Sequence, residues 1–504
     1  MKEFDTLFGL SKRASLLQGI SHLLEWDQET SMPPGAAEIR SEQIELLAAL
    51  THKERTSAAF VQALSHFIDL ESGKVRIADL KPWQKAALRE WLHDLKKARA
   101  LPASFVSEFA KLTALGIVIW AEARKENDFK KFAPHLKKIV AMNQKKADYL
   151  GYKEHLYDAL LDLFEPGCTT KQISTIFQKL GKEVKELVQM ISQKPPIDDS
   201  CLMRAVARET QLHFGEKLLQ AMGYEMKFGR LDLSTHPFST SMHPTDSRVT
   251  TRIQEGSLFD CISAVLHEGG HGLYEMGLDP EYYGCPIGES RSLGIHESQS
   301  RWWETRIGQS RAFWKHFFPL LQKSYRGNLE HTELNTFYRA INKVTPSFIR
   351  VEADEVTYSL HVILRFEIEK QLIEGELSVT EVPEAWNSMM ESLLGISPPS
   401  DSKGCLQDIH WSMGAFGYFP TYTLGNLYCA EFFDAFAKKH PDWESRVAKG
   451  ELLFIKEWQN KEIHKYGRMY STKELLKRVT GKTLSIAPYM NYLKKKYHEI
   501  YNNC

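Results

Sequence analysis

Two histidines and a glutamate are the residues in this chain most suited to chemistry. The segment from Leu266 to Gly272 reads LHEGGHG, so His267 and His271 lie four residues apart and Glu268 directly follows the first. On a helix, positions i and i+4 share a face, so both imidazoles can reach one metal ion. Glu268 lies slightly aside, where it can accept a proton from a water molecule that the metal activates. The pattern therefore predicts a zinc site built for hydrolysis.

The residues around the pentad must be considered too, because the pentad alone can arise by chance in a chain with 19 histidines. Apolar residues at helical spacing on both sides predict the helix that the chemistry requires. Gly269, Gly270 and Gly272 oppose that helix, since each costs a helix interior about 0.5–1 kcal/mol relative to alanine. We expect that the missing side chains let a substrate or a neighbouring segment approach the metal closely.

A third metal ligand must come from elsewhere in the chain, because a catalytic zinc usually takes three protein ligands and keeps a position for water. Glu297 lies 26 residues beyond His271 and begins a stretch of helical character. The intervening loop contains Pro280 and Pro286, which allows the chain to turn and a second helix to return. His296 is a rival ligand that the spacing does not exclude. Glu297 can also be read as a surface carboxylate at a helix start.

Hydrolysis also needs a hydrogen-bond donor for the negative charge that develops on the scissile carbonyl. The candidate donors are His236, His410, Tyr418 and Tyr422. The sequence ranks none of them, since tyrosine and histidine are also common core residues. Asp408 and His410 are candidates for a supporting role, in which they orient a ligand or close the cleft.

The composition is that of an ordinary globular protein. The chain has 504 residues, of which 43% are hydrophobic and 25% charged, and its 64 basic residues balance 64 acidic ones. No overall field favours nucleic acid or an anionic membrane, and no secretory signal or uninterrupted apolar run of about 18 residues is present. Seven cysteines without a CxxC pair fit reduced thiols. We therefore expect a cytoplasmic protein without nucleic-acid or membrane partners.

Helical periodicity dominates the chain. Apolar residues recur every three or four positions across most of the segment from residue 300 to the end and in the segments 14–24, 38–50, 83–95, 105–124, 132–150, 170–190 and 201–222. Between 224 and 252 the pattern alternates instead, which predicts short strands at 226–228, 231–233 and 248–252. The sequence thus predicts a mostly α fold: one large helical domain, 1–504, with a central active-site cleft between two lobes and a small β-sheet near the metal helix.

Further motifs make the chain similar, nearly from end to end, to the carboxypeptidase Taq metallocarboxypeptidases. The segments Trp26 to Gly35 and Trp120 to Arg124 also look like that family. In chain order, the six motifs are His236-Pro237-Phe238, Asp246-Ser247-Arg248-Val249-Thr250, His267-Glu268-Gly269-Gly270-His271, His296-Glu297-Ser298-Gln299, Ile349-Arg350-Val351-Glu352-Ala353-Asp354 and Gly404-Cys405-Leu406-Gln407-Asp408-Ile409-His410-Trp411.

The resemblance implies a cytosolic, helical, homodimeric exopeptidase that removes single residues from the carboxyl termini of peptides, with zinc or sometimes cobalt as its metal. In that family, the metal ligands match His267, His271 and Glu297, and the general base matches Glu268. The resemblance thus favours Glu297 over His296 as the third ligand.

Cleavage at a carboxyl terminus requires a cation that recognises the free α-carboxylate, and the planar fork of arginine can bind both of its oxygens. Arg350 and Arg248 lie in motifs that the family associates with gripping the substrate terminus. Each can instead form a structural ion pair, with Asp354 and Asp246 as the respective local partners.

Two other functions remain open on the sequence. An oligopeptidase or endopeptidase with the same HExxH pentad would use the two histidines and Glu268 equally well. A non-catalytic helical scaffold could bind metal through the histidines, although a closed structural site has no use for the free carboxylate of Glu268.

Overall fold

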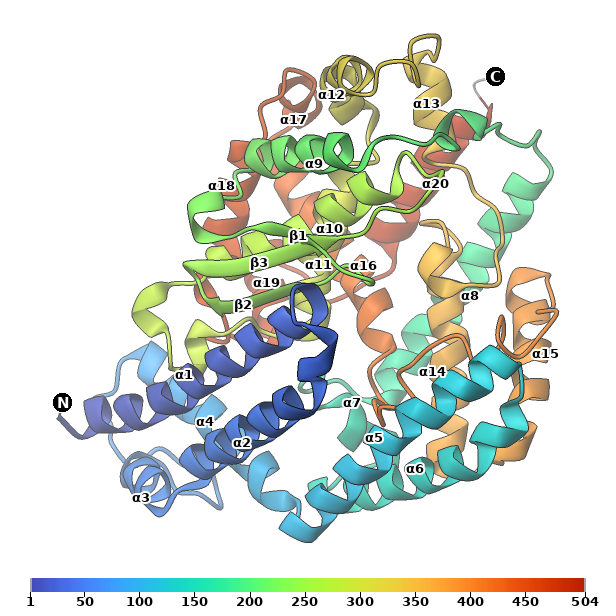
Figure 1. Ribbon diagram of the computed structural model, residues 1–504. Helices are drawn as coiled ribbons and strands as arrows, with labels where there is room; N and C mark the ends of the chain where they lie inside the picture. Colours follow the sequence, from blue (N-terminus) through green and yellow to red (C-terminus); the bar gives the residue numbers. More distant parts are fainter. Residues whose placement is uncertain (1, 503–504) are drawn as a thin grey trace.

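Helices form most of the structure, a computed structural model that describes residues 2–502 (Figure 1). The predicted mostly α fold is confirmed, and α-helices occupy most of each predicted helical segment, whereas residues 203–207 and 395–419 contain no helix. The α-helices are α1 (Lys2–Thr30), α2 (Ala37–Thr56), α3 (Ala58–Phe67), α4 (Pro82–Ala100), α5 (Ala103–Glu126), α6 (Phe129–Leu150), α7 (Leu156–Leu161), α8 (Thr170–Ser192), α9 (Arg208–Met222), α10 (Asp260–Met276), α11 (Leu293–Arg301), α12 (Arg311–Ser324), α13 (Leu334–Ala340), α14 (Tyr358–Glu374), α15 (Val382–Leu394), α16 (Pro420–Lys439), α17 (Trp443–Val447), α18 (Leu453–Glu462), α19 (Thr472–Thr480) and α20 (Ala487–Asn502).

The small sheet has three strands, β1 (Leu231–Leu233), β2 (Ser239–His243) and β3 (Asp246–Thr251), in the order β1-β3-β2. β3 is central, parallel to β1 and antiparallel to β2. The prediction of a strand at 226–228 was wrong, since Met226–Phe228 is a 3-10 helix. Three residues are too few to distinguish the alternation of a strand from a tight turn. β2 escaped prediction because its sequence, STSMH, carries almost no apolar signal.

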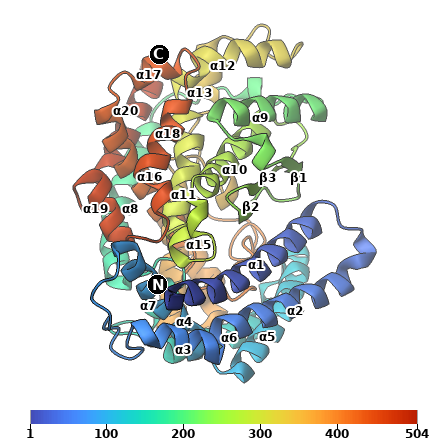
Figure 2. The same cartoon turned by 90° about the vertical axis from the view of Figure 1, so that its left-hand side faces the viewer.

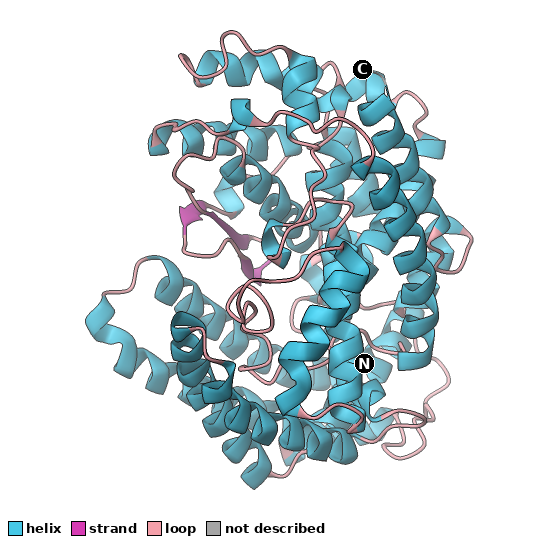
Figure 3. Cartoon of the chain, turned by 90° about the vertical axis from the view of Figure 1, so that its right-hand side faces the viewer, coloured by secondary structure: helices cyan, strands magenta, loops and turns pink. Residues whose placement is uncertain are grey.

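Helix α10 contacts the sheet, α9 and α11 (Figure 2). Figure 3 shows the small sheet, in magenta, among the helices. The central residues of α10 are buried because apolar side chains recur along more than one face. Val249 of β3 is fully buried against it and packs beside Gly272. The sheet therefore supports the helix that carries the histidine pair.

Gly270 allows the backbones of α10 and α11 to touch. A Cβ atom at this position would lie 2.6 Å from the carbonyl oxygen of Gln299 and 2.7 Å from Cα of Ser300. Both atoms belong to the backbone of α11, so neither can turn aside. The space that the sequence predicts beside Gly270 is therefore occupied by a neighbouring segment, α11.

The other two glycines also make room for protein. A Cβ on Gly269 would lie 2.7 Å from Cδ2 of Leu219 in α9, and one on Gly272 would lie 2.7 Å from the ring of Tyr224. The space beside Gly269 and Gly272 is not open to a peptide, because side chains of α9 and of the segment after it occupy it. The loss of helix propensity at three positions is thus the cost of close packing around α10.

Two clusters of buried apolar side chains form the core. The smaller one joins α1, α3 and α4 to the loop residues 285–287, and the larger one includes the sheet, α10 and the carboxyl-terminal helices. Figure 2 shows α1 and α2 as a long antiparallel pair that extends beside the sheet. His22 of α1 contacts the carbonyl oxygen of Ser241 in β2 through Nδ1, at 3.0 Å. The division of one domain into two lobes stays a prediction.

Helix α5 is, among the described residues, the one helix long and apolar enough to cross a membrane by length and composition alone. One such helix is weak evidence, and here one face packs on the protein. Trp120 Nε1 donates a hydrogen bond to the carbonyl oxygen of Leu406 at 2.9 Å, and Gly116 lies against the backbone of Ser412. The absence of a membrane partner stays a prediction.

Replacing Gly270 with alanine should lower the free energy of unfolding by about 1–3 kcal/mol, because the added methyl group collides with the backbone of α11. Gly269→Ala is the matched control: its methyl group meets the flexible ends of Leu219 and Met222, and the gain in helix propensity offsets much of the strain. Chemical denaturation of both metal-free variants measures the difference. Equal midpoints would show that the helix contact is not fixed by Gly270.

Candidate active site

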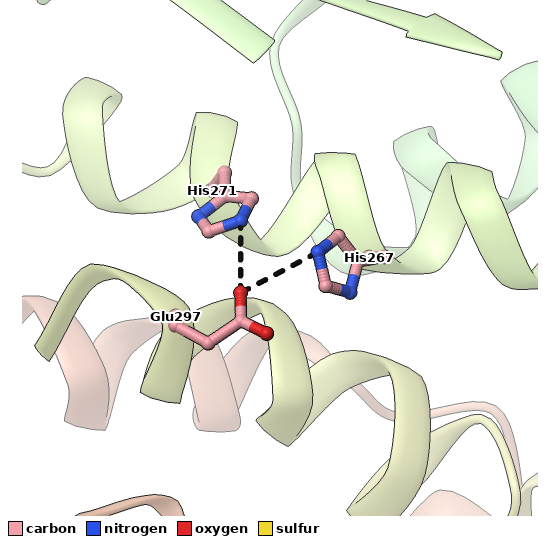
Figure 4. Close-up of side chains that lie close together, drawn as sticks. All are labelled: His267, His271 and Glu297. Carbon is pink, nitrogen blue, oxygen red and sulfur yellow. Dashed lines mark ion pairs between the residues drawn. The ribbon is translucent and has the colours of Figure 1, made fainter. Parts of the chain in front are cut away.

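His267, His271 and Glu297 converge on one point (Figure 4). The two histidines lie on the same face of α10, one turn apart, and Glu297 approaches from α11. Oε2 of Glu297 lies 3.5 Å from Nε2 of His267 and 3.3 Å from Nε2 of His271. One nitrogen or oxygen atom from each residue lies within 4.8 Å of the others. Two imidazole nitrogens and a carboxylate oxygen at such separations suit a divalent cation.

Local sequence fixes the carboxylate of Glu297. Ser292 caps α11 by accepting a hydrogen bond from the backbone N–H of Ile295 at 3.2 Å. Ser300, on the next turn, donates from Oγ to Oε2 of Glu297 at 2.8 Å. Gly425 of α16 lies directly against the side chain of Glu297, where a Cβ would find no room. Glu297 is therefore confined between α10 and α16.

Glu304 orients His267. It belongs to the π-helix Trp302–Ile307 that continues α11, and its Oε2 lies 2.8 Å from Nδ1 of His267. An ionised carboxylate only accepts hydrogen bonds, so Nδ1 carries a proton and Nε2 is the nitrogen that faces the cluster. Arg301 and Ser263 also donate to Glu304, at 2.7 and 3.2 Å. Burial opposes ionisation, but Arg301 and His267 hold the pKa of Glu304 at about 2.

His296, the rival ligand, lies behind His271 and is not part of the cluster. Its Nε2 lies 2.8 Å from Oε1 of Glu275, and its Nδ1 makes a short contact with Nδ1 of His271. Because Glu275 can only accept, the proton of a neutral His296 is on Nε2, and its Nδ1 then accepts from His271. The Nε2 atom of His271 is thereby left with a free lone pair toward Glu297.

Charge and burial act in opposite directions on the cluster. Burial lowers the pKa of His267, but Glu297 and Glu304 outweigh it and raise that pKa to about 9. For His271 burial prevails, and its pKa falls to about 4. Burial would raise the pKa of Glu297, yet His267 and His271 hold it at about 2. Glu297 is therefore an ionised carboxylate between two imidazoles.

Glu268 has a buried carboxylate, 7% exposed, that makes no hydrogen bond or ion pair with any residue from 2 to 502. Burial raises its pKa to about 7, while His267 lowers it and Glu297 raises it further. A carboxylate with this pKa can both accept and release a proton near neutral pH. Nothing in the described fold otherwise uses this group.

Arg350 is held by Asp408, and not by Asp354, the local partner that the sequence offered as an alternative to a substrate role. Nε and Nη2 of Arg350 donate to Oδ1 of Asp408 at 3.1 and 2.9 Å, and Nη1 donates to the hydroxyl of Tyr358 at 2.9 Å. Arg365 shares the same carboxylate through Nε, at 2.7 Å. Asp354 instead accepts backbone N–H groups of its own turn. Neighbours in sequence were poor guides because Arg350 points away from that turn.

Three of the four candidate donors gather beside Arg350. The ring of Tyr422 lies 4.7 Å from its guanidinium carbon, and the hydroxyl of Tyr422 lies 3.2 Å from Nε2 of His410. Tyr418 is hydrogen-bonded to Tyr422, and burial, followed by the charge of Glu297, raises the pKa of Tyr418. Burial lowers the pKa of His410 to about 3, so this imidazole is neutral.

His236 and Arg248 lie apart from this group. His236 is exposed in the loop between β1 and β2. Arg248 forms a bidentate ion pair with Asp246, at 2.8 and 3.0 Å, and its guanidinium lies 4.6 Å from the ring of Trp26 in α1. Neither side chain has a hydrogen bond or ion pair with the His267 cluster in the described part of the chain. The expected alternative for Arg248, a local pair with Asp246, is what the structure shows.

Sequence reasoning missed the residues that orient the histidines, Glu304 and Glu275. A usable signal existed for Glu304, which lies seven residues after Glu297 and directly follows two tryptophans in the run WWETRI. Charged residues in such a run need buried partners. Glu275 offered less, because a glutamate four residues after His271 on a helix is common on surfaces.

A cavity of about 470 Å³ adjoins the site. It lies between α1, β2 and the loop 283–290, and both Glu275 and His296 line it. Ser239, Thr240 and Ser241 of β2 line it too, so the strand borders the same cavity as Glu275 and His296. The cavity brings solvent-accessible space to the side of α10 that bears His271.

Known proteins match the chain over nearly its whole length. The family model described as carboxypeptidase Taq (M32) metallopeptidase matches residues 6–497. Thermostable carboxypeptidase 1 of Thermus thermophilus is 39% identical over 99% of each chain, and carboxypeptidase 1 of Bacillus subtilis is 36% identical over 99% of this chain and 98% of its own. The crystal structure of the M32 carboxypeptidase from Deinococcus radiodurans is 36% identical, with a TM-score of 0.96 over 100% of both chains.

These matches confirm the resemblance and the exopeptidase interpretation, and they leave no support for an endopeptidase or an inert scaffold. The likeness covers the sheet, α10 and α11, where the three residues of Figure 4 converge. The chain belongs to the carboxypeptidase Taq (M32) metallopeptidases and is a metal-dependent carboxypeptidase.

Proposed function

We propose that His267, His271 and Glu297 hold zinc, with cobalt as a functional substitute, and that Glu268 is the general base. The observation that carries this proposal is the buried carboxylate of Glu268, which has no partner among residues 2–502 and adjoins three converging ligand atoms. Zinc in such a site lowers the pKa of water to about 7 and polarises a carbonyl group.

The residues of the chain then divide the work of peptide hydrolysis. Glu268 accepts the proton of the attacking water and passes it to the leaving amine, so the amine departs uncharged. Glu304 and His296 keep the protons of the two imidazoles on Nδ1, which leaves Nε2 free for the metal. Tyr418 is our preferred donor to the developing oxyanion, because its hydroxyl is within the electrostatic influence of both Glu297 and Glu268.

We propose that Arg350 binds the α-carboxylate of the substrate. A guanidinium has five N–H groups, and three bonds to Asp408 and Tyr358 leave two for a ligand. Both Arg350 and Glu297 influence the pKa of Tyr358 and of Tyr422, which supports a position of these rings between clamp and metal ligands. A buried, fixed guanidinium binds a carboxylate with little loss of side-chain entropy.

We propose that the protein acts in the cytoplasm as a homodimer, as the family resemblance implies. The six cysteines that the structure describes form no disulfide, which fits a reducing compartment. Val106, Leu115 and Val118 of α5 are about half exposed, at 46%, 54% and 55%, and a second subunit could remove apolar surface of this kind from water. Light scattering tests the stoichiometry, and a monomer at cellular concentrations would contradict it.

Glu268→Gln should lower kcat by about a hundredfold to ten-thousandfold while zinc affinity stays unchanged, because only proton transfer is lost. Mass spectrometry of peptide ladders measures the release of single terminal residues. Wild-type protein treated with chelator should release none until zinc or cobalt is restored. Full activity of the chelated protein, or of Glu268→Gln, would exclude the proposed chemistry.

Glu304→Gln should weaken zinc binding by about tenfold to a hundredfold, because a neutral amide holds the Nδ1 proton of His267 less strongly than a carboxylate. Glu209→Gln, on the exposed surface of α9, is the matched control and should bind zinc normally. Competition with a coloured chelator gives both affinities. If the two variants bind zinc equally well, Glu304 does not support the metal site.

Arg350→Ala should remove most of the preference for a free-acid peptide over its carboxyl-terminal amide, a change of about tenfold to a hundredfold in the ratio of kcat/KM values. Asp408 keeps Arg365 as a partner in this variant, so the fold should persist. Arg248→Ala should keep the preference, since Arg248 is already paired with Asp246. An undiminished preference in Arg350→Ala would refute the clamp.

A further inference from the structure

A second and larger cavity, of about 1040 Å³, lies outside the candidate active site. Parts of the π-helix, α12, α16, α17 and α20 line it, and none of the residues of Figure 4 does. In Figure 2, α12, α17 and α20 come together at the end of the molecule far from α1 to α4. A cavity of this size can hold an organic molecule.

Arg306 lines this cavity and makes no hydrogen bond with any residue from 2 to 502. Its side chain is 7% exposed, and Nε and Nη1 are buried without a hydrogen bond. No ion pair to Arg306 exists among residues 2–502. The guanidinium lies between two rings, 3.5 Å from the centre of Tyr492 and 4.8 Å from that of Phe433. Arginine does not lose its proton, so a desolvated cation with free donors is unfavourable unless an acceptor completes it.

The buried carboxylate of Glu355 is hydrogen-bonded to other side chains. Oε2 of Glu355 accepts from Nζ of Lys496 at 2.7 Å and from the hydroxyls of Tyr492 and Tyr497, each at 3.2 Å. Lys496 itself is 8% exposed and lines the same cavity. Glu355 therefore balances Lys496, and the charge of Arg306 remains uncompensated.

The rest of the lining is also basic. Seven lysine and arginine residues line the cavity against four acidic residues. One of the acidic side chains, Asp434, already pairs with Lys438 at 2.9 Å. Glu431 accepts from the backbone N–H of Ser485 at 3.0 Å and, within residues 2–502, makes no hydrogen bond or ion pair with Arg306. Lys482 and Lys495 are exposed and have no ion pair in the described part of the chain. The cavity thus combines a cationic mouth with a buried cation inside.

We propose that this cavity binds an organic anion, whose phosphate or carboxylate group accepts hydrogen bonds from Arg306. The two rings hold the guanidinium plane in place, which suits the planar pairing of arginine with an oxyanion. Tyr338, Tyr492 and Trp443 line the remaining space and provide apolar surface for the body of the ligand. This site is separate from peptide hydrolysis and does not depend on the metal.

Titration calorimetry of the full-length, zinc-loaded protein tests the proposal with inorganic phosphate and with acetate, each against chloride at equal ionic strength. The wild type should bind at least one of the two anions saturably, and the two arms distinguish the phosphate from the carboxylate source. Arg306→Gln should weaken that binding by about tenfold to a hundredfold, the range for hydrogen bonds to a charged group. Any anion binding at Arg350 remains in this variant and is thereby subtracted.

Lys482→Ala tests the same site without touching the core and should weaken binding by about twofold to fivefold, as expected for an exposed charge. Lys138→Ala on α6, also exposed and away from the cavity, is the matched control and should bind as the wild type does. The proposal fails if neither anion binds saturably, or if a folded Arg306→Gln binds normally. If Arg306→Gln does not fold, equal affinities of the Lys482→Ala and Lys138→Ala variants would overturn it.

Discussion

The backbone contact between α10 and α11 at Gly270 is the constraint on which the rest of the site depends. Two helices with ordinary side chains at their crossing lie 8–10 Å apart. Here a glycine places one helix against the carbonyl oxygen of Gln299 in the other. Glu297 is only two residues from that contact, so the distance between its carboxylate and the two imidazoles is set by the backbone. The surrounding helices and the sheet hold α10 in position for this contact.

A ring of polar residues then fixes what the helix crossing brings together. Each imidazole has one nitrogen turned toward the common point and the other tied to a carboxylate, directly through Glu304 or by way of His296 and Glu275. The π-helix contributes to this, because it carries Glu304 toward His267. Arg306, two residues further on, lines the cavity at the other side. The π-helix thus supplies Glu304 to the histidine cluster and Arg306 to the second cavity.

The histidine pair and the helical class could be predicted because they depend on short-range patterns, whereas Glu297 was favoured over His296 only by the family resemblance. The i, i+4 spacing of His267 and His271 defines a helix face, and apolar periodicity defines the long helices. The partner of Arg350 could not be predicted, because Asp408 comes from a segment 58 residues away that only the tertiary fold brings near. β2 was missed for a related reason: its polar residues become a strand through pairing with β3, not through their own preference.

The sharing of Asp408 has an electrostatic consequence. Two buried guanidinium groups, Arg350 and Arg365, face a single carboxylate, and the neighbouring His410 is neutral. Without a bound substrate, these four side chains together therefore carry one uncompensated positive charge in a medium that solvates charge poorly. A peptide carboxylate that binds at Arg350 would make the assembly neutral. Selectivity for chain ends would then arise from a charge deficit in the resting enzyme, which an amide or an internal segment of a peptide has no means of filling.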